Sequence, residues 1–197
     1  MRHKGINKEE TRRKMTEAVG QGFRQHGYAG IGVDGLAKAA GVTSGAFYSH
    51  FGSKDGAFEV ALAAGLDEVI KGMPEFQSEY GVDWVKAFAD YYLGKQHRTD
   101  LACGCAMAAL TSEVVRSSAE LHAKYEKKMK VIAELVARGL AGGTDKERLA
   151  RAWSMLGVLI GGINIARAMK GTKASEEVAA AIKDAAVKAA GRTLRCA

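Results

Sequence analysis

Apolar residues recur at intervals of three and four along almost the whole chain, which is the period of an α-helix with one buried face. The pattern predicts about nine helices, near residues 8–27, 34–40, 44–50, 54–72, 83–97, 103–117, 119–140, 145–169 and 175–192. Glycine-rich residues 27–32 separate the first helix from the second, and Pro74 is expected to close the fourth. No segment alternates apolar and polar residues convincingly enough to predict a strand, so we expect an all-α protein.

Residues 33–51 carry the most specific local pattern. The apolar residues of a first short helix stand at helical spacing: Val33, Leu36, Ala37 and Ala40. Gly41 supplies the backbone conformation that ends a helix, and Val42 can pack beneath the corner. Thr43 or Ser44 can then cap the start of a second helix. The pattern therefore predicts two short helices joined at a glycine.

The second of these helices has two different faces. Phe47 and Phe51 lie four residues apart and share the face that should dock against the rest of a small domain. The remaining surface is suited to a DNA major groove, with Thr43, Ser44, Gly45 and Ala46 at the bases and Tyr48, His50 and Lys54 at the phosphates. An ordinary helical hairpin with a capped second helix is the alternative.

Five segments in this part of the chain occur in a specific order and spacing: Phe23–Tyr28, Val33, Leu36–Val42, Phe47–Phe51 and Ser53–Asp55. Together they resemble the DNA-binding region of the TetR family of transcriptional repressors, over about a quarter of the chain. Two residues depart from the family pattern. Gly32 stands where a Thr or Ser usually caps the helix, and Gly35 stands where an acidic residue is more common.

The resemblance implies how the chain is organised. Residues 1–52 would form a helix-turn-helix DNA-binding domain of three helices, and residues 53–197 a helical ligand-binding and dimerisation domain. A homodimer would bind a palindromic operator in double-stranded DNA, with half-sites about 34–36 Å apart. A small-molecule effector would move the fourth helix, so that the two DNA-binding domains no longer match the operator.

Charge and composition agree with this hypothesis. The formal net charge is +7, and residues 1–56 hold nine Lys or Arg against five Asp or Glu. The basic residues of the first helix and the segment before it could contact phosphates, or could form an ordinary solvated surface: Arg2, Lys4, Lys8, Arg12, Arg13 and Lys14. The chain begins with charged sequence and has no uninterrupted apolar run of membrane-spanning length, so we expect a cytoplasmic protein that does not enter a membrane.

The C-terminal part predicts close helix packing. The helix near 145–169 is apolar on more than one face and contains Gly157, Gly161 and Gly162, each of which costs roughly 1 kcal/mol relative to Ala inside a helix. Close approach of another backbone or of a ligand would explain these glycines. The last helix presents a stripe of small residues that pairs two subunits in the TetR family, or packs only within its own subunit: Val178, Ala181, Ile182, Ala185, Ala186 and Ala189.

A set of aromatic, sulfur-containing and apolar side chains could line a ligand pocket, although at helical spacing such residues more often form plain core: Trp84, Phe88, Tyr91, Tyr92, Cys105, Met107, Leu110 and Trp153. Glu113 could reach into the same cavity as a polar anchor, or lie exposed at the surface.

Cys103 and Cys105 are expected at a helix N-terminus, where the helix dipole lowers a thiol pKa. A thiol-based redox or electrophile sensor on the same fold is therefore an alternative function, beside buried thiols that only fill space. An enzyme that uses the same pair would need a base, and His97 is the nearest candidate. Three cysteines, including Cys196, form neither a secreted disulfide framework nor, with His97 and His122, a metal site.

We therefore expect a ligand-responsive DNA-binding regulator, most simply a repressor, with no enzymatic activity, cofactor or metal. A sequence-neutral nucleic-acid binder driven by charge is a further alternative, but it gives the shaped second helix and the large apolar body no role.

Overall fold

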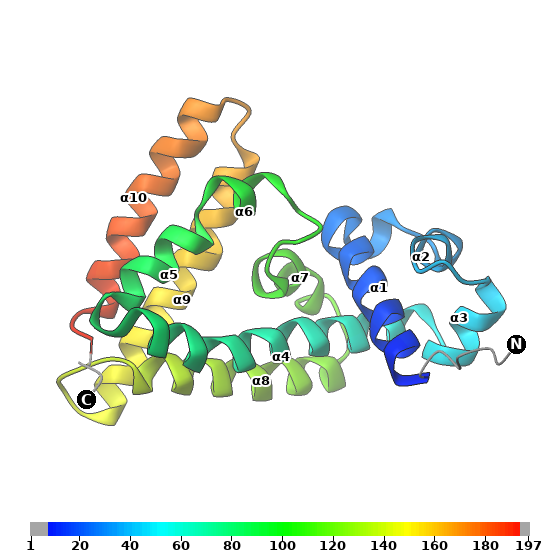
Figure 1. The fold of residues 1–197 in the computed structure, drawn as a ribbon, viewed down its shortest axis with the longest axis horizontal. Coiled ribbons are helices and arrows are strands. Elements are labelled where there is room, and N and C mark those ends of the chain that lie inside the picture. Colours follow the sequence, from blue (N-terminus) through cyan, green and yellow to red (C-terminus); the bar gives the residue numbers. More distant parts are fainter. Residues whose placement is uncertain (1–7, 194–197) are drawn as a thin grey trace, which may run out of the picture.

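The computed structural model describes residues 8–193 as an all-helical protein, which confirms the predicted fold class (Figure 1). Its helices are α1 (Lys8–Gly30), α2 (Val33–Ala39), α3 (Ser44–Phe51), α4 (Lys54–Tyr80), the short 3-10 helix η1 (Gly81–Asp83), α5 (Trp84–Tyr92), α6 (Lys95–Thr99), α7 (Ala106–Val114), α8 (Ala119–Arg138), α9 (Asp145–Ala168) and α10 (Thr172–Ala190). The expectations for Arg2, Lys4 and Cys196 lie outside the described residues.

The region from α1 to the start of α4 packs around one aromatic cluster. Phe23 of α1, Leu36 of α2 and Phe47 of α3 are fully buried, and the ring of Phe58 of α4 meets that of Phe23 edge to face with centroids 5.2 Å apart. α1 itself is interrupted at Gly27, whose φ of 70° breaks the helical backbone as the glycine-rich segment predicted.

The corner between α2 and α3 forms as expected. Gly41 has a φ of 66°, and its N–H donates to the Lys38 carbonyl while the N–H of Val42 donates to the Ala37 carbonyl, which is the Schellman end of a helix. Thr43 caps α3, because its side-chain oxygen accepts a hydrogen bond from the Ala46 N–H at 3.2 Å. The direction of α3 is thus determined by local hydrogen bonds.

The prediction that Pro74 ends the fourth helix is wrong, because α4 continues to Tyr80. Proline removes one backbone hydrogen bond, but contacts with α8 and α5 hold the last turns in place. The side-chain amide of Gln77, for example, donates to the Leu135 carbonyl of α8 at 3.0 Å. Packing between distant segments has outweighed a local helix-breaking signal.

Two further helix boundaries differ from the prediction. The expected helix at 83–97 is two helices, since α5 ends at Tyr92 and α6 begins after Gly94, where Arg98 donates to the Leu93 carbonyl at 2.8 Å. α7 begins at Ala106 rather than at 103, because residues 101–104 form a turn in which the Gly104 N–H donates to the Leu101 carbonyl.

The body places α4 beside α8, and α9 beside α10 at the end far from α3 (Figure 1). α9 alone among the described helices is long and apolar enough to span a membrane by length and composition, yet it packs against α7, α8 and α10, and only 39% of its most apolar window is buried within the subunit. Part of an apolar helix therefore remains uncovered.

Candidate functional site

The outer face of α3 is not covered by other residues in the described range 8–193. Gly45, Ala46 and Tyr48 are exposed, with 51% of Tyr48 accessible, while Phe47 and Phe51 on the opposite face are buried. Adding a methyl group at Gly45 would meet no atom closer than 3.9 Å. A flat groove wall can therefore approach this face closely.

The polar residues predicted to contact DNA are held in several ways. The hydroxyl of Ser44 donates to the Asp34 carboxylate at 2.7 Å, while Thr43 is exposed beside its cap hydrogen bond. His50 is half-buried against the ring of Phe51, and its Nε2 has no hydrogen-bond partner among the described residues. His50 Nε2 is therefore buried and is not exposed at the outer face of α3.

Lys54 lies at the start of α4 on an aromatic support. Its ammonium group stands 4.4 Å from the centre of the Tyr28 ring, a cation–π contact. The Tyr28 hydroxyl in turn donates to the Asp55 carboxylate, and this hydrogen bond raises the pKa of Tyr28 to about 12. Tyr28 thereby connects Lys54 to the end of α1.

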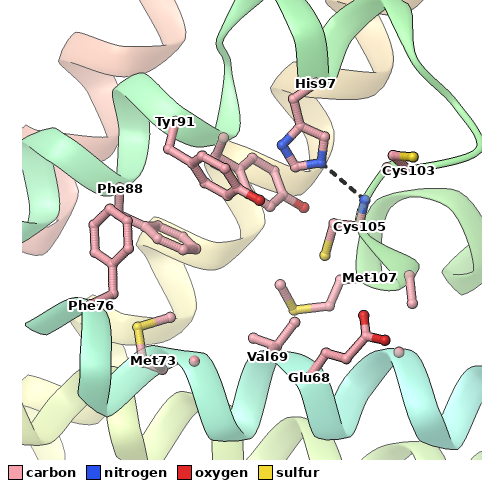
Figure 2. A pocket seen from close by; sticks show the side chains of 15 residues that line it. Glu68, Val69, Met73, Phe76, Phe88, Tyr91, His97, Cys103, Cys105 and Met107 are labelled. Carbon is pink, nitrogen blue, oxygen red and sulfur yellow. Dashed lines mark hydrogen bonds between the residues drawn. The ribbon is translucent and has the colours of Figure 1, made fainter.

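A cavity of about 280 Å³ lies in the body between α4, α5, α6 and the start of α7 (Figure 2). Four predicted ligand-binding residues line it: Phe88, Tyr92, Cys105 and Met107. Tyr91, which was also predicted as a pocket residue, lines it too, whereas five other lining residues were not predicted as ligand contacts: Glu68, Val69, Met73, Phe76 and His97. The residues from α4 escaped prediction because their spacing is that of any buried helix face.

The other three predicted ligand-binding residues lie elsewhere. Trp84 is buried where its indole N–H donates to the Gly139 carbonyl at 3.1 Å, at the junction of α5 and α8. Leu110 is fully buried core, and Trp153 is 39% exposed on α9. None of the three lines the cavity.

One end of the cavity is polar. His97 Nε2 accepts a hydrogen bond from the Cys105 N–H at 2.9 Å, and the His97 carbonyl accepts from the guanidinium of Arg167 at 2.7 Å. Burial, with a smaller effect from Arg167, lowers the pKa of His97 to about 4, so the imidazole is neutral at physiological pH. Since Nε2 is the acceptor, Nδ1 carries the proton.

The thiols do not have the expected lowered pKa. Cys105 caps α7, but burial raises its pKa, and a hydrogen bond with the Asp100 carboxylate raises the pKa of the exposed Cys103. The expectation that the helix dipole activates them is thus wrong, because desolvation and a neighbouring negative charge outweigh a partial charge. Neither thiol is held as a thiolate at neutral pH.

The α7 segment connects the cavity to α1. At its N-terminal side, the carbonyl of Ala102 accepts a hydrogen bond from Arg24 Nε of α1 at 2.7 Å, directly beside the cavity-lining residue Cys103. At its C-terminal end, Glu113 accepts from the Tyr28 N–H at 3.4 Å and pairs with Arg116 at 3.2 Å. Glu113 therefore contacts the turn at the end of α1 and does not line the cavity.

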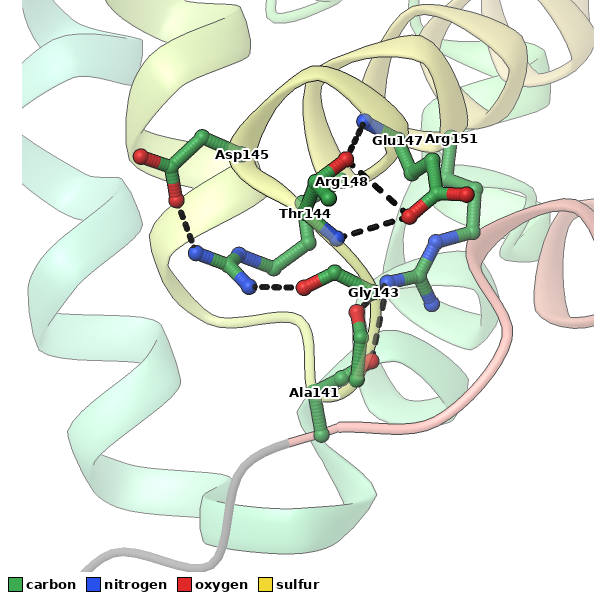
Figure 3. Close-up of polar contacts among 8 residues, drawn as sticks. Ala141, Gly143, Thr144, Asp145, Glu147, Arg148 and Arg151 are labelled. Carbon is green, nitrogen blue, oxygen red and sulfur yellow. Dashed lines mark hydrogen bonds and ion pairs between the residues drawn. The ribbon is translucent and has the colours of Figure 1, made fainter.

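The α9–α10 pair is fastened at its base (Figure 3). Thr144 and Glu147 form a capping box at the start of α9. The guanidinium of Arg151 donates to the carbonyls of Ala141 and Gly142, and also to the Ala190 carbonyl of α10 at 2.9 Å. These hydrogen bonds join the first turns of α9 to the loop before it and to the end of α10.

The glycines of α9 divide into two kinds. A methyl group at Gly162 would lie 2.2 Å from the side chain of Ile182, so this glycine permits α10 to pack closely. Close approach of another helix was one of the two explanations expected from the sequence. At Gly157 and Gly161 nothing lies within 4 Å. These two belong to the uncovered side of α9, together with Trp153 and Ile165.

Comparison with known proteins places these features in a family context. The family described as "Bacterial regulatory proteins, tetR family" matches residues 21–61, from the second half of α1 into α4. The HTH-type transcriptional repressor AcnR of Corynebacterium efficiens is 30% identical over 151 residues, which cover 71% of this chain and 69% of AcnR.

Solved structures share the fold across nearly the full length. The reduced form of NemR from Escherichia coli has a TM-score of 0.70 and 20% identity, over 89% of this chain and 97% of that one. A TetR transcriptional regulator from Legionella pneumophila has a TM-score of 0.72 and 16% identity, over 92% of this chain and 98% of that one.

Proposed function

The chain belongs to the TetR family of bacterial transcriptional regulators, and from this premise we propose that it is a ligand-responsive repressor. As a homodimer it binds a palindromic operator in double-stranded DNA, and it is released when a small molecule occupies the cavity in the body. The observation that carries the proposal is α3: a short helix capped at Thr43, anchored by two buried phenylalanines and uncovered on its other face.

We assign the DNA contacts to the predicted residues. Thr43, Ser44, Gly45 and Ala46 face base edges, where small side chains allow close approach. Tyr48, His50 and Lys54 contact phosphates. The Tyr28 ring holds the Lys54 ammonium group in position through the cation–π contact, which favours a defined phosphate contact. We propose that residues 1–52 form the DNA-binding domain. They supply all of these contacts except that of Lys54, which lies at the start of α4.

The second half, residues 53–197, binds the effector and forms the dimer. Trp153, Gly157, Gly161 and Ile165 leave an apolar, partly flat surface on α9, and the same surface of a second copy is its natural cover. α9 is apolar enough to span a membrane by composition. Burial of its uncovered face in a dimer accounts for this composition in a protein that we propose to be cytoplasmic.

The cavity is the proposed effector site, with Phe88, Tyr92, Cys105 and Met107 as contacts. The route to DNA runs along α4, which lines the cavity and begins beside α3, and along α7 through its contacts with Arg24 and Tyr28. A change at the cavity can thus reorient α1 and α3. We propose no catalytic role, because no described geometry pairs a nucleophile with an activated base.

The deciding experiment compares operator and random DNA. DNA upstream of the gene and its neighbours is screened for an inverted repeat, and binding to this duplex and to a scrambled duplex of the same length is measured from low to high salt. A sequence-reading dimer keeps a preference of about 10³-fold or more at physiological salt. Equal affinities with the same salt slope for both duplexes would instead identify a binder driven by charge alone.

A further inference from the structure

The apolar end of the cavity is built to contact a flat ring. Phe76 and Phe88 meet edge to face with centroids 5.5 Å apart, and Phe88 lies 5.7 Å from Tyr92. The side chains of Met73 and Met107 complete this wall, and thioethers adapt readily to aromatic faces (Figure 2). A volume of about 280 Å³ is at the small end for ligand pockets, so the ligand has one or two rings.

The polar end holds two donors that lack partners. Tyr92 Oη and His97 Nδ1 are buried polar atoms that make no hydrogen bond of good geometry among the described residues, although the Cys105 thiol adjoins Tyr92 and the Tyr91 backbone adjoins His97. Both side chains line the cavity. Tyr92 is 1% exposed and His97 is 9% exposed. Burial and the adjoining Cys105 thiol raise the pKa of Tyr92, so its hydroxyl remains protonated. A buried donor without a partner destabilises the free protein, and an acceptor on a ligand would recover this loss.

The charges around the cavity disfavour an ionic ligand. No Lys or Arg lines it in the described part of the chain, and Glu68 stands at its edge. A carboxylate ligand would lose its hydration without a direct contact to a cationic side chain, because the Arg167 guanidinium donates to the His97 carbonyl and does not line the cavity. A cation at the polar end would face two hydrogen-bond donors, Tyr92 Oη and His97 Nδ1, where it needs acceptors.

We propose that this cavity binds an uncharged aromatic compound of one or two rings that carries a carbonyl-type hydrogen-bond acceptor, with the acceptor at Tyr92 and His97 and the ring against Phe76 and Phe88. The proposal rests on the proposed function for the role of the cavity as effector site, and it adds the chemical class of the ligand. Binding of such a compound in the cavity does not depend on whether the chain represses transcription.

Four compounds of nearly the same shape test the assignment by calorimetric titration of the full-length protein: 2-acetylnaphthalene, 2-isopropenylnaphthalene, 2-naphthoate and 2-naphthamidinium. The ketone offers an acceptor, the alkene has none, and the last two carry opposite charges. We expect the ketone to bind about tenfold more tightly than each of the others, which corresponds to one good buried hydrogen bond. Tightest binding of the alkene or of either ion would overturn the ligand class.

The variant Tyr92→Phe should lower the preference for ketone over alkene to about threefold or less, because one of the two donors is removed. Tyr125→Phe is the matched control, since its hydroxyl already lies 2.8 Å from the Thr111 hydroxyl and does not line the cavity. It should leave the ratio unchanged. Because each variant is judged by a ratio of two ligands, any general loss of stability cancels.

The two proposals fail separately. If operator DNA is bound selectively but none of the four compounds binds, the ligand class is wrong and the regulator stands. If the ketone is preferred as expected but no sequence-selective DNA binding exists, the cavity assignment stands and the function fails. An unchanged ketone preference in Tyr92→Phe would remove Tyr92 from the polar end and overturn the assignment as stated.

Discussion

The outer face of α3 and the cavity of the body are both proposed binding sites, but their polar groups differ in burial and in hydrogen bonding. On α3 the backbone is satisfied by its own caps and the small side chains lie open to water. The cavity is partly open to solvent, but Tyr92 and His97 at its polar end are buried, and their two donors lack hydrogen bonds. An exposed face costs the free protein little free energy and derives its specificity from shape and charge. A buried donor without a partner carries a free-energy cost until an acceptor binds.

This difference predicts different responses to mutation. A surface that acts through close approach is sensitive to added bulk. A buried polar site is sensitive to the loss of single atoms and to protonation.

The largest effect is expected from Ala46→Trp on α3. The indole would hold α3 away from base edges, so operator affinity should fall by about 100-fold or more, towards the affinity for random DNA. Fluorescence anisotropy with a labelled operator measures the change, and circular dichroism checks the fold. Ala123→Trp, at an exposed alanine of α8, is the control that should bind normally. Normal operator affinity for Ala46→Trp would show that this face does not enter the groove.

A second large effect is expected from Gly161→Glu on α9. A side chain fits there within one subunit, because nothing lies within 4 Å, but two symmetry-related carboxylates would be buried in the proposed dimer. Light scattering should report a monomer, and operator affinity should fall by about tenfold or more. Ala123→Glu supplies the same charge at an exposed site of α8. A Gly161→Glu dimer of unchanged mass would place the interface elsewhere.

The cavity should make stability depend on pH through His97. Its folded pKa of about 4 is below its ordinary value of 6.5, so between these values the unfolded chain binds a proton that the folded chain does not. The free energy of unfolding should therefore fall as pH drops from about 6.5 to about 4, by up to about 3 kcal/mol.

Urea denaturation at several pH values measures this dependence. His97→Gln retains a side-chain acceptor for the Cys105 N–H but cannot titrate, so its stability should change less over the same range. The exposed His122 provides the control, because His122→Gln should keep the full pH dependence. Identical curves for the parent protein and His97→Gln would assign the acid sensitivity to other groups.

The smallest effect is expected from Lys54→Ala. Loss of one phosphate contact should weaken binding to operator and random DNA alike, and lower the salt slope by about one unit. Lys130→Ala, which removes a charge paired with Glu126 on α8, should leave the slope unchanged. If Lys54→Ala also leaves it unchanged, the ammonium serves only to stabilise Tyr28.

The sequence predicted the local structure of α2 and α3 better than the cavity. Gly41, Thr43 and the pair Phe47 and Phe51 act on neighbours within a few residues, so their patterns predict the corner, the cap and the buried face, all of which the structure contains. The cavity joins α4, α5, α6 and α7, and Phe76 had no local signal to show that it would line the same cavity as Cys105. For the same reason Trp84 and Leu110, equally apolar, could not be separated from the lining residues. His97 was singled out only by its closeness in sequence to the two cysteines.

By itself, the sequence determined the helical fold class, the two short helices near 33–51 and the excess of positive charge around them, because helix caps, turns and apolar periodicity depend on nearby residues. Only the tertiary structure decided that α4 continues through Pro74, that the thiols have raised pKa values, and that Tyr92 and His97 keep unpaired donors. Contacts with α8 and α5 continue α4, burial raises the pKa of Cys105 and isolates the donors of Tyr92 and His97, and the Asp100 carboxylate raises the pKa of Cys103. Helix contacts and burial arise when segments distant in the chain pack together and exclude water from one another.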